Sequence, residues 1–367
     1  MATAKGRTAG PVAAFRKQDS TSWGTAISLT AAGHGLILNE VPDFLNKPEQ
    51  LPDEAMGFEF KEYIDAGNKV ITPAPAMDLR YDGALWRLIA QAVGSDSSAT
   101  ATSGASGTLY NHTMDVQAEN AGLFGTFCVF DGITVREVPS FTPTGFTLSG
   151  ESGNFWQLTV RGIGDDCLLS GQTNSGSAAG VNGISAATPT SKVLRVPFGA
   201  TTFRINDQSG STLAAGDNLY PNAINFEFDR DSRPNFLANA VDDGSGNEWS
   251  TLEPDEDGVP TGVLTVTFPK YTTVTHLQDL GDETLKKATI TIGGPTPTGY
   301  GGDYDITMSF PALRIVDMAV DPAGSTKIIQ SITCEVLKAQ AAPSGMTGIT
   351  DMFRILLANL TSAEFDA

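Results

Sequence analysis

Hydrophobic and polar residues alternate along several stretches of the chain, with the period of two that half-buried β-strands require. In the clearest stretch, residues 304–310, Tyr, Ile, Met and Phe alternate with Asp, Thr and Ser. The Gly-containing segment 149–154 separates two apolar runs, and this arrangement predicts an antiparallel hairpin. Further alternating runs, each expected to form a strand, are residues 154–160, 224–228, 263–268 and 328–337.

Two longer stretches space their apolar residues three and four apart, as one face of a helix does. The first, residues 82–94, begins at the acceptor Asp82 and stops at Gly94. The second, residues 350–360, lies near the C-terminus, and we expect it to dock on its own domain or on a neighbouring subunit. A shorter helix is expected around residues 274–280. The apolar side of the C-terminal helix would comprise Phe353, Leu356, Leu357 and Leu360.

The uncharged, Gly-, Ser- and Ala-rich stretch 171–190 has the composition of a flexible linker, and we place a domain boundary there. The elements before and after it follow the same order with a shift of roughly 180 residues, which suggests a duplication. The expected organisation is a first β domain (1–170), the linker (171–190), a second β domain (191–340) and a C-terminal helical segment (341–367). The predicted fold class is mainly β, with two tandem antiparallel β-sandwich or barrel domains, each with one flanking helix, plus a C-terminal helix.

Charge narrows the choice of partners. The 367 residues include 42 acids and 23 bases, for a net charge of -19. Such a surface repels the phosphates of nucleic acids and anionic membranes, so binding through a basic footprint is excluded. No apolar run approaches the roughly 20 residues that span a bilayer. The N-terminal residues are not followed by an apolar h-region, so we expect no secretion signal.

Candidate chemistry is sparse. Three cysteines without CxxC spacing predict neither a disulfide framework nor a thiolate metal site. Three histidines and the absence of hydrolase, zinc, P-loop and dinucleotide motifs argue against an enzyme. The acidic runs 241–248 and 253–258 lack the alternate spacing of a calcium loop. We therefore expect no catalytic residue, no cofactor and no metal.

A series of short motifs carries a resemblance to a known family. They occur in this order: residues 15–25 with Lys17-Gln18 and Trp23-Gly24-Thr25, the helix block 81–94, the His-containing strand 110–113, residues 131–135, and the hairpin 146–162. In this order, the stretch from Ala14 to Ser170 resembles the tail tube (major tail) proteins of long-tailed bacteriophages. The second half resembles them by its order of elements.

The resemblance implies a structural protein of the virion, assembled in the bacterial host cytoplasm. Its β-sandwich or barrel domains would join around rings that stack into a hollow, acidic-lined tube for DNA ejection. The implied partners are further copies of the chain, the tape measure protein in the lumen, the tail terminator and tail tip proteins, and genomic DNA in transit without specific binding. No membrane is implied. Because each chain would supply two domains, a ring of six domains needs three chains; a ring of six chains is the alternative.

Two acidic, Pro-containing segments, 39–54 and 242–257, precede equivalent strands in the two halves. Either they reach the next ring, or they are solvated surface loops. The candidate inter-ring anchors are Phe44, Leu45, Trp249 and Leu252. The candidate acidic loop or lumen residues are Glu40, Asp43, Asp53, Glu54, Asp242, Asp243, Asp255, Glu256 and Asp257.

The alternative function is a β-sandwich adhesin or carbohydrate-binding module, in which exposed aromatic side chains would stack on sugars. Trp23, Trp86 and Trp156 fall in expected core or helix positions, which leaves Trp249 as the one expected to be exposed. This distribution counts against a sugar-binding platform.

Overall fold

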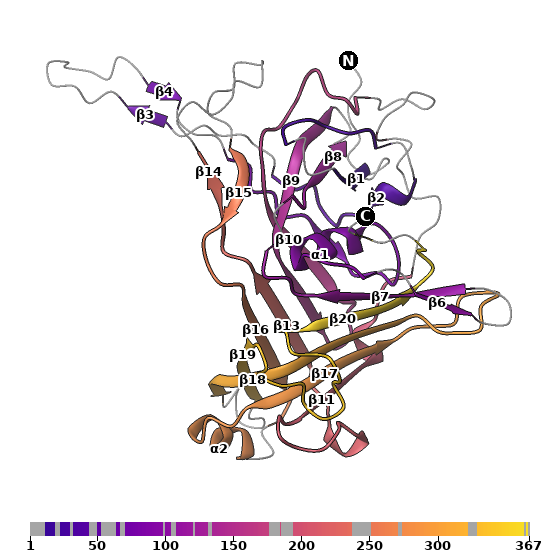
Figure 1. Ribbon diagram of the computed structural model, residues 1–367, viewed down its shortest axis with the longest axis vertical. Helices are drawn as coiled ribbons and strands as arrows, with labels where there is room; N and C mark the ends of the chain where they lie inside the picture. Colours follow the sequence, from indigo (N-terminus) through magenta and orange to yellow (C-terminus); the bar gives the residue numbers. More distant parts are fainter. Residues whose placement is uncertain are drawn as a thin grey trace, which may run out of the picture.

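The structure is a computed structural model that describes residues 12–18, 23–29, 32–43, 50–52, 64–66, 70–97, 100–103, 108–119, 122–130, 134–175, 184, 194–236, 251–270, 274–321, 329–362 and 365. These residues form a mainly β fold whose strand pairs are antiparallel, as predicted (Figure 1). Two α-helices occur in the described part, α1 (Leu85–Val93) and α2 (Thr275–Gly281).

The strands before residue 170 are β1 (Val12–Lys17), β2 (Gly35–Leu36), β3 (Gln50–Pro52), β4 (Ile64–Ala66), β5 (Ala76–Asp78), β6 (Thr100–Ser103), β7 (Thr108–Asp115), β8 (Gly125–Phe130), β9 (Val135–Glu151) and β10 (Gln157–Gly164). Those after it are β11 (Thr201–Asp207), β12 (Asn218–Leu219), β13 (Ala223–Asp229), β14 (Ser232–Asn235), β15 (Leu252–Glu256), β16 (Thr261–Phe268), β17 (Lys286–Gly293), β18 (Asp305–Asp321), β19 (Ile329–Leu337) and β20 (Arg354–Asn359). Short 3₁₀ helices are η1 (Ala32–His34), η3 (Phe198–Ala200) and η4 (Ala215–Asp217).

The two halves of the chain share one strand order. In the first half the neighbours are β2-β1-β8-β9-β10-β5, and in the second half they are β12-β11-β17-β18-β19-β16. In each half a 3₁₀ helix precedes the short strand, and the α-helix follows β5 or β16. We call these two sets of elements the first and second repeat.

Details of register also repeat. The long strands β9 and β18 have 17 residues each, and each has a bulge opposite the preceding hairpin strand. Pro139 lies in the first bulge and Pro311 in the second, where an unpaired position tolerates a residue without an N–H. The side-chain amide of Gln18 donates to the Pro139 carbonyl at 3.0 Å, and that of Gln208 donates to the Pro311 carbonyl at 3.0 Å.

Strands of both repeats belong to one sheet. The strand β13 pairs with β16 of the second repeat on one edge and with β9 of the first repeat on the other. The strand β20 pairs with β18 and with β7, which lies between α1 and β8 in the chain. One buried hydrophobic cluster contains residues of both repeats. The domain boundary within 171–190 stays a prediction, because most of that stretch lies outside the described residues.

The C-terminal helix predicted for residues 350–360 is wrong, because residues 354–359 form the strand β20. Ile355 and Leu357 are buried, while Leu356, expected in the core, is 38% exposed. The spacing of the apolar residues in this segment fits both the 3.6-residue period of a helix and the two-residue period of a strand. Ladders with β7 and β18 on its two edges satisfy the backbone, and these tertiary contacts override the helical pattern.

Candidate assembly surface

A six-strand stretch of the sheet has one apolar and one polar face. It runs β10-β9-β13-β16-β19-β18, and directly opposed residues in adjacent strands point to the same side. One row on the apolar face is Leu158, Leu148, Phe226, Leu264, Cys334 and Ile315, all buried. The next row, on the opposite side, is Gln157, Ser149, Asn225, Thr265, Thr333 and Asp317. We call this second side the polar face.

Charged residues on the polar face are mostly acidic. Arg161 forms ion pairs there with Glu227 and, at 3.3 Å, with Asp229. Hydroxyl and amide side chains fill most of the remaining positions, so the face offers few cations to a polyanion. Among paired positions whose side chains the structure describes, the carboxylates are Glu151, Glu227, Asp229, Asp317 and Glu335, and the bases are Arg161 and Arg314.

The strand β13 joins the two repeats, and we call its ladder with β9 the seam. It pairs residues 145–151 with residues 223–229 and continues where the Arg230 amide donates to the Thr144 carbonyl at 2.9 Å. Gly145 lies so close to β13 that a Cβ there would clash with the Phe228 carbonyl oxygen. The seam is therefore a specific close contact of two backbones.

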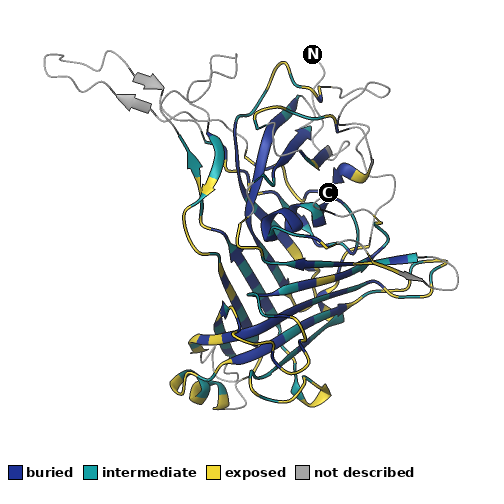
Figure 2. Ribbon diagram, in the orientation of Figure 1, coloured by how far each residue is buried: buried dark blue, intermediate teal, exposed yellow. Residues whose placement is uncertain are grey.

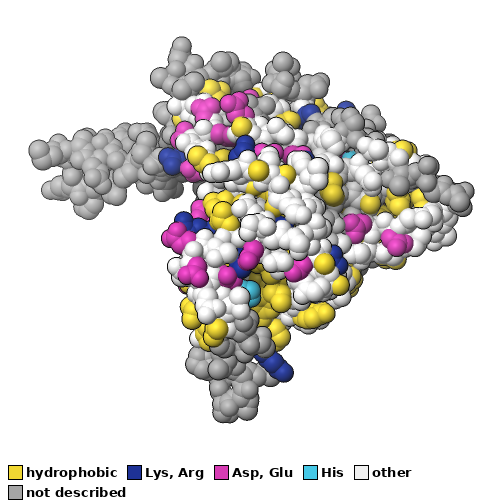
Figure 3. All heavy atoms as spheres, turned by 60° about the horizontal axis from the view of Figure 1, so that its bottom comes forward, with side chains coloured by type: hydrophobic (Ala, Val, Ile, Leu, Met, Phe, Trp, Pro, Cys, Tyr) yellow, Lys and Arg dark blue, Asp and Glu magenta, His cyan; other side chains and the backbone are white. Residues whose placement is uncertain are grey.

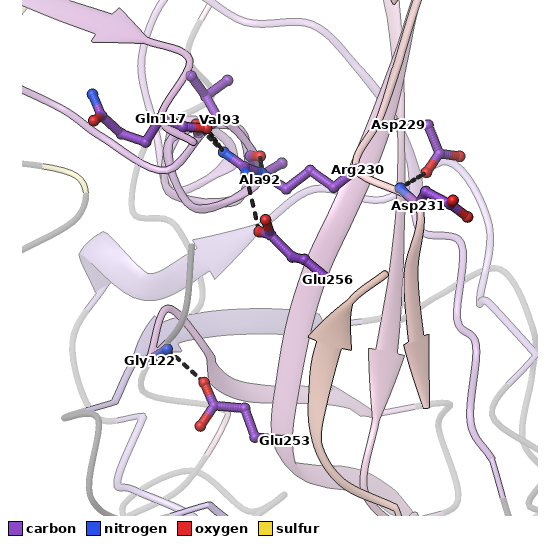
Figure 4. A network of polar contacts seen from close by, with 9 residues as sticks. All are labelled: Ala92, Val93, Gln117, Gly122, Asp229, Arg230, Asp231, Glu253 and Glu256. Atoms are coloured by element: carbon purple, nitrogen blue, oxygen red, sulfur yellow. Dashed lines mark hydrogen bonds and ion pairs between the residues drawn. The ribbon is translucent and has the colours of Figure 1, made fainter. Parts of the chain in front are cut away.

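Arg230, the residue after β13, binds this joining strand to the helix of the first repeat (Figure 4). Its fully buried guanidinium donates to the carbonyls of Ala92, at 2.6 Å, and Val93 at the end of α1, and to that of Gln117 at 3.1 Å. It also pairs with Glu256 at 2.9 Å. A cation at a helix C-terminus satisfies carbonyls that have no partner within the helix and complements the helix dipole.

The β14–β15 hairpin, which follows Arg230, lies alongside the first repeat (Figure 1). The Glu253 carboxylate accepts a hydrogen bond from the Gly122 amide, and the Thr251 carbonyl accepts one from the Trp23 indole at 3.0 Å. The hairpin extends the contact between the repeats beyond the seam.

Four of the sequence-predicted residues on this surface are placed near the hairpin. Leu252, partly buried, opens β15, and Asp255 is exposed on the same strand. Glu256 pairs with Arg230, and Asp257 lies 3.5 Å from the Arg233 guanidinium. These three acids thus belong to the hairpin, not to the strands of the polar face.

Two more predicted acids, Glu40 and Asp43, are exposed in the segment that leads from β2 toward β3. The structure does not bring them to the hairpin acids by any contact it describes. The remaining predicted residues lie outside the described residues: Phe44, Leu45, Asp53, Glu54, Asp242, Asp243 and Trp249.

Sequence reasoning missed Arg230 and the seam, although a repeated motif marks the equivalent places. Residues 31–39 and 214–222 share Ala-Ala-Gly, then Leu, then Asn at the same spacing. The two asparagines act alike: the Asn39 amide donates to the Ala76 carbonyl of β5, and the Asn222 amide to the Thr267 carbonyl of β16, both at 2.9 Å. In the second repeat the next residue begins β13.

The part of the chain that the structure describes holds no group of three or more His, Cys, Asp or Glu suited to a metal ion. His112 is buried between Asp96, at 2.9 Å, and the Thr361 carbonyl, at 2.9 Å, where it fastens the segment after β20. None of the described helices is long and apolar enough to span a bilayer.

No protein-family model matches the chain, and no curated protein matches it.

Proposed function

We propose that this chain is a structural virion protein that self-assembles into stacked rings, which form a phage tail tube for DNA ejection. The observation that carries the proposal is the joining of two repeats of one topology, edge to edge, into a sheet with one polar face. When similar units pair through their strand edges, the pairing can be repeated from unit to unit around a ring until the last edge meets the first.

The polar face is suited to line the channel. DNA binding gains most of its affinity from basic residues that neutralise phosphates and release counterions. A wall of hydroxyls, amides and carboxylates lacks that gain, and DNA would pass it without being held. The proposed partners are further copies in trimeric rings, with six chains as the alternative, the tape measure protein, and the tail terminator and tail tip proteins.

The adhesin or carbohydrate-binding alternative has less support. Trp86 and Trp156 are fully buried, and Trp23 packs edge-on against Phe124 with ring centroids 5.1 Å apart. None of the described tryptophans is thus free to stack on a sugar.

Electron microscopy of the purified protein tests the proposed function. We expect rings or tubes about 100 Å wide, the size of six ordinary domains around a channel. Monodisperse monomers at every concentration would overturn it.

A further inference from the structure

Two residues near the end of the chain, Thr361 and Phe365, are held against the first half of the molecule. The Thr361 hydroxyl donates to the Asp82 carboxylate just before α1, with 2.6 Å between the oxygens. The Thr361 carbonyl lies 2.9 Å from Nε2 of His112 in β7. Phe365, 1% exposed, packs on the His112 ring with centroids 4.3 Å apart, and its amide donates to Asp96 at 2.8 Å. We call these contacts of Thr361 and Phe365 the C-terminal latch.

The latch lies beside the buried helix of the molecule (Figure 2). All residues of α1 except Arg87 are buried, whereas no residue of α2 is. The α2 end, turned forward in Figure 3, presents acidic side chains among uncharged ones and a group of hydrophobic side chains. His112 and Asp96 are both buried, so a polar atom of the latch that loses its partner is shielded from water.

Hydrogen-bond chemistry fixes the number of protons at the centre of the latch. Nε2 of His112 faces the Thr361 carbonyl oxygen, which can only accept, so this nitrogen carries a proton. Nδ1 lies 2.9 Å from Oδ2 of Asp96. That contact needs one more proton, either on Nδ1 beside a carboxylate or on Asp96 beside a neutral imidazole. In both cases the pair holds one proton more than a neutral histidine beside an ionised aspartate.

The groups around His112 favour this extra proton. Burial lowers the pKa of His112, but the hydrogen bond to Asp96 and the charge of that carboxylate act against it. The Thr361 carbonyl and the Asn359 side chain act in the same direction as Asp96, and the pKa of His112 is raised above its ordinary value of 6.5. From β20, the residue opposite His112 in the ladder is apolar. The other carboxylate of the latch, Asp82, binds the Thr361 hydroxyl.

We propose that this proton locks the C-terminal segment onto the first half of the molecule, and that its loss above neutral pH releases Thr361 and Phe365. A neutral His112 has a single N–H for two acceptors, so one of its two hydrogen bonds is lost. The ladders of β20 with β7 and β18 do not depend on the proton, so the opening is local and the fold persists. The latch belongs to the single chain and does not rest on the proposed function.

The latch should be closed at low pH and open at high pH. The folded chain holds the proton of His112 more tightly than the unfolded chain, whose histidine has the ordinary pKa of 6.5. The stabilisation by the latch is therefore fully present below pH 6.5 and is lost as the pH rises through the raised pKa. Because one proton is involved, the ratio of closed to open latch falls by as much as about tenfold per pH unit above that pKa.

Hydrogen–deuterium exchange between pH 6 and pH 9, read by mass spectrometry on the peptide that contains Thr361 and Phe365, tests the latch. In the wild type, protection of this peptide should fall by as much as about tenfold per pH unit once His112 has lost its proton. In His112→Gln the side chain does not titrate, so protection should be lower at pH 6 and should not depend on the latch proton at higher pH. The peptide has the same sequence in both chains, so the ratio of the two exchange rates removes the intrinsic effect of pH on exchange.

The matched control is His276→Gln in α2, which also removes a histidine near an aspartate, Asp279 at 3.7 Å. This variant should keep the pH-dependent loss of protection that the wild type shows. Constant protection of the wild type relative to His112→Gln from pH 6 to pH 9 would overturn the proposed latch.

A second measurement keeps the test decisive if His112→Gln does not fold. In NMR spectra of the wild type, His34→Gln and His276→Gln, the imidazole signal that persists in both variants belongs to His112. Burial lowers the pKa of His34 to about 4 and also lowers that of His276. His112 should instead titrate above its ordinary pKa, and the Phe365 amide signal should shift over the same pH range. Titration of His112 below its ordinary pKa, or a Phe365 signal that does not follow it, would overturn the proposal.

Discussion

The first repeat is closed and the second is open, although both have one strand order. In the first, β9 is paired along both edges at its C-terminal part and α1 is buried. In the second, the β17 edge of β18 has no ladder partner beyond Leu313 in the described part of the chain, and no residue of α2 is buried. The covering strand β13 comes from the later part of the chain, so the first repeat is completed by a strand outside it. No later strand covers the equivalent edge of the second repeat among the described residues.

The repeats also differ at the opposite ends of their long strands. Near the start of β9, the buried Glu137 carboxylate accepts hydrogen bonds from the amides of Thr173 and Asn174, both at 2.9 Å. Near the start of β18, the strand β20 fills the corresponding edge with an ordinary ladder. On the corresponding edge of β9 the backbone of Glu137 pairs with Leu168 in an isolated bridge, so a single bridge in one repeat stands where the other has a ladder. Similar topology therefore does not require similar side chains at the edges.

Among the variants that weaken the first repeat, removal of Arg230 should lower the free energy of unfolding most. Arg230→Ala removes one donor to three carbonyls and the cation that pairs with Glu256, and breaking a buried pair costs about 4 kcal/mol. Urea unfolding of the unassembled chain measures the loss. Arg233→Ala, which removes a 65% exposed side chain from β14 in the same hairpin, should change stability by no more than about 0.5 kcal/mol. Equal losses for the two variants would show that Arg230 does not join the repeats.

A buried acid of the first repeat should make stability depend on pH. Burial raises the pKa of Asp165 to about 7, against hydrogen bonds such as that from the Ser140 amide at 3.0 Å. The folded chain therefore holds this proton more tightly than the unfolded chain. Its contribution is fully favourable below the ordinary pKa of 3.8 and is lost as the pH rises toward 7.

Asp165→Asn removes this titration while keeping an acceptor for the Ser140 amide. The variant should gain as much as about 4 kcal/mol over wild type above pH 7, and this gain should vanish near pH 4. Thermal melting at pH 4, 6 and 8 measures the difference. A gain of equal size at all three values would rule out the buried proton as its cause.

Substitution of Gly145 distinguishes the seam from the equivalent edge of β18. Gly145→Val places a branched side chain against the Phe228 carbonyl and should cost about 3 kcal/mol, as overpacking does. Asp317 is the equivalent residue of β18, because each follows the bulge directly. Asp317→Val should leave the melting of the unassembled chain within about 1 °C of wild type. A large loss of stability in Asp317→Val would mean that the β18 edge is already covered within one chain.

Local pattern predicted much of the fold. Alternation at 304–310 and 263–268 is confirmed by β18 and β16, and the helix expected within 82–94 is confirmed by α1. The helix that the apolar spacing predicted at 350–360 is wrong, because this segment forms β20 with partners that lie far away in the chain. Local periodicity reports which side chains can be buried, whereas the neighbouring strand decides the backbone conformation.

The assembly surface could be predicted only in part. Repeated order suggested two similar halves, but pairing of β13 with β9 joins residues 223–229 to 145–151 across the Gly-rich stretch, and no local signal encodes such a pairing. Arg230 is one basic residue in an acidic region, and its role exists only after α1 ends beside it. The shared Ala-Ala-Gly, Leu and Asn spacing was the readable signal for the equivalent segments.

The smallest expected loss of stability is that of Gln208, whose side chain donates to the Pro311 carbonyl in its bulge as that of Gln18 does to the Pro139 carbonyl. Gln18 is buried, and besides the Pro139 carbonyl it contacts Thr126 and Ser140 through hydrogen bonds of 2.9 and 3.0 Å. Gln208 is only partly buried and donates to the Pro311 carbonyl. At about 1 kcal/mol for each buried hydrogen bond, Gln18→Ala should cost about 3 kcal/mol and Gln208→Ala about 1 kcal/mol in urea unfolding. If Gln208→Ala cost as much as Gln18→Ala, the second repeat would be as closed around its bulge as the first, and its openness would be confined to the β18 edge and α2.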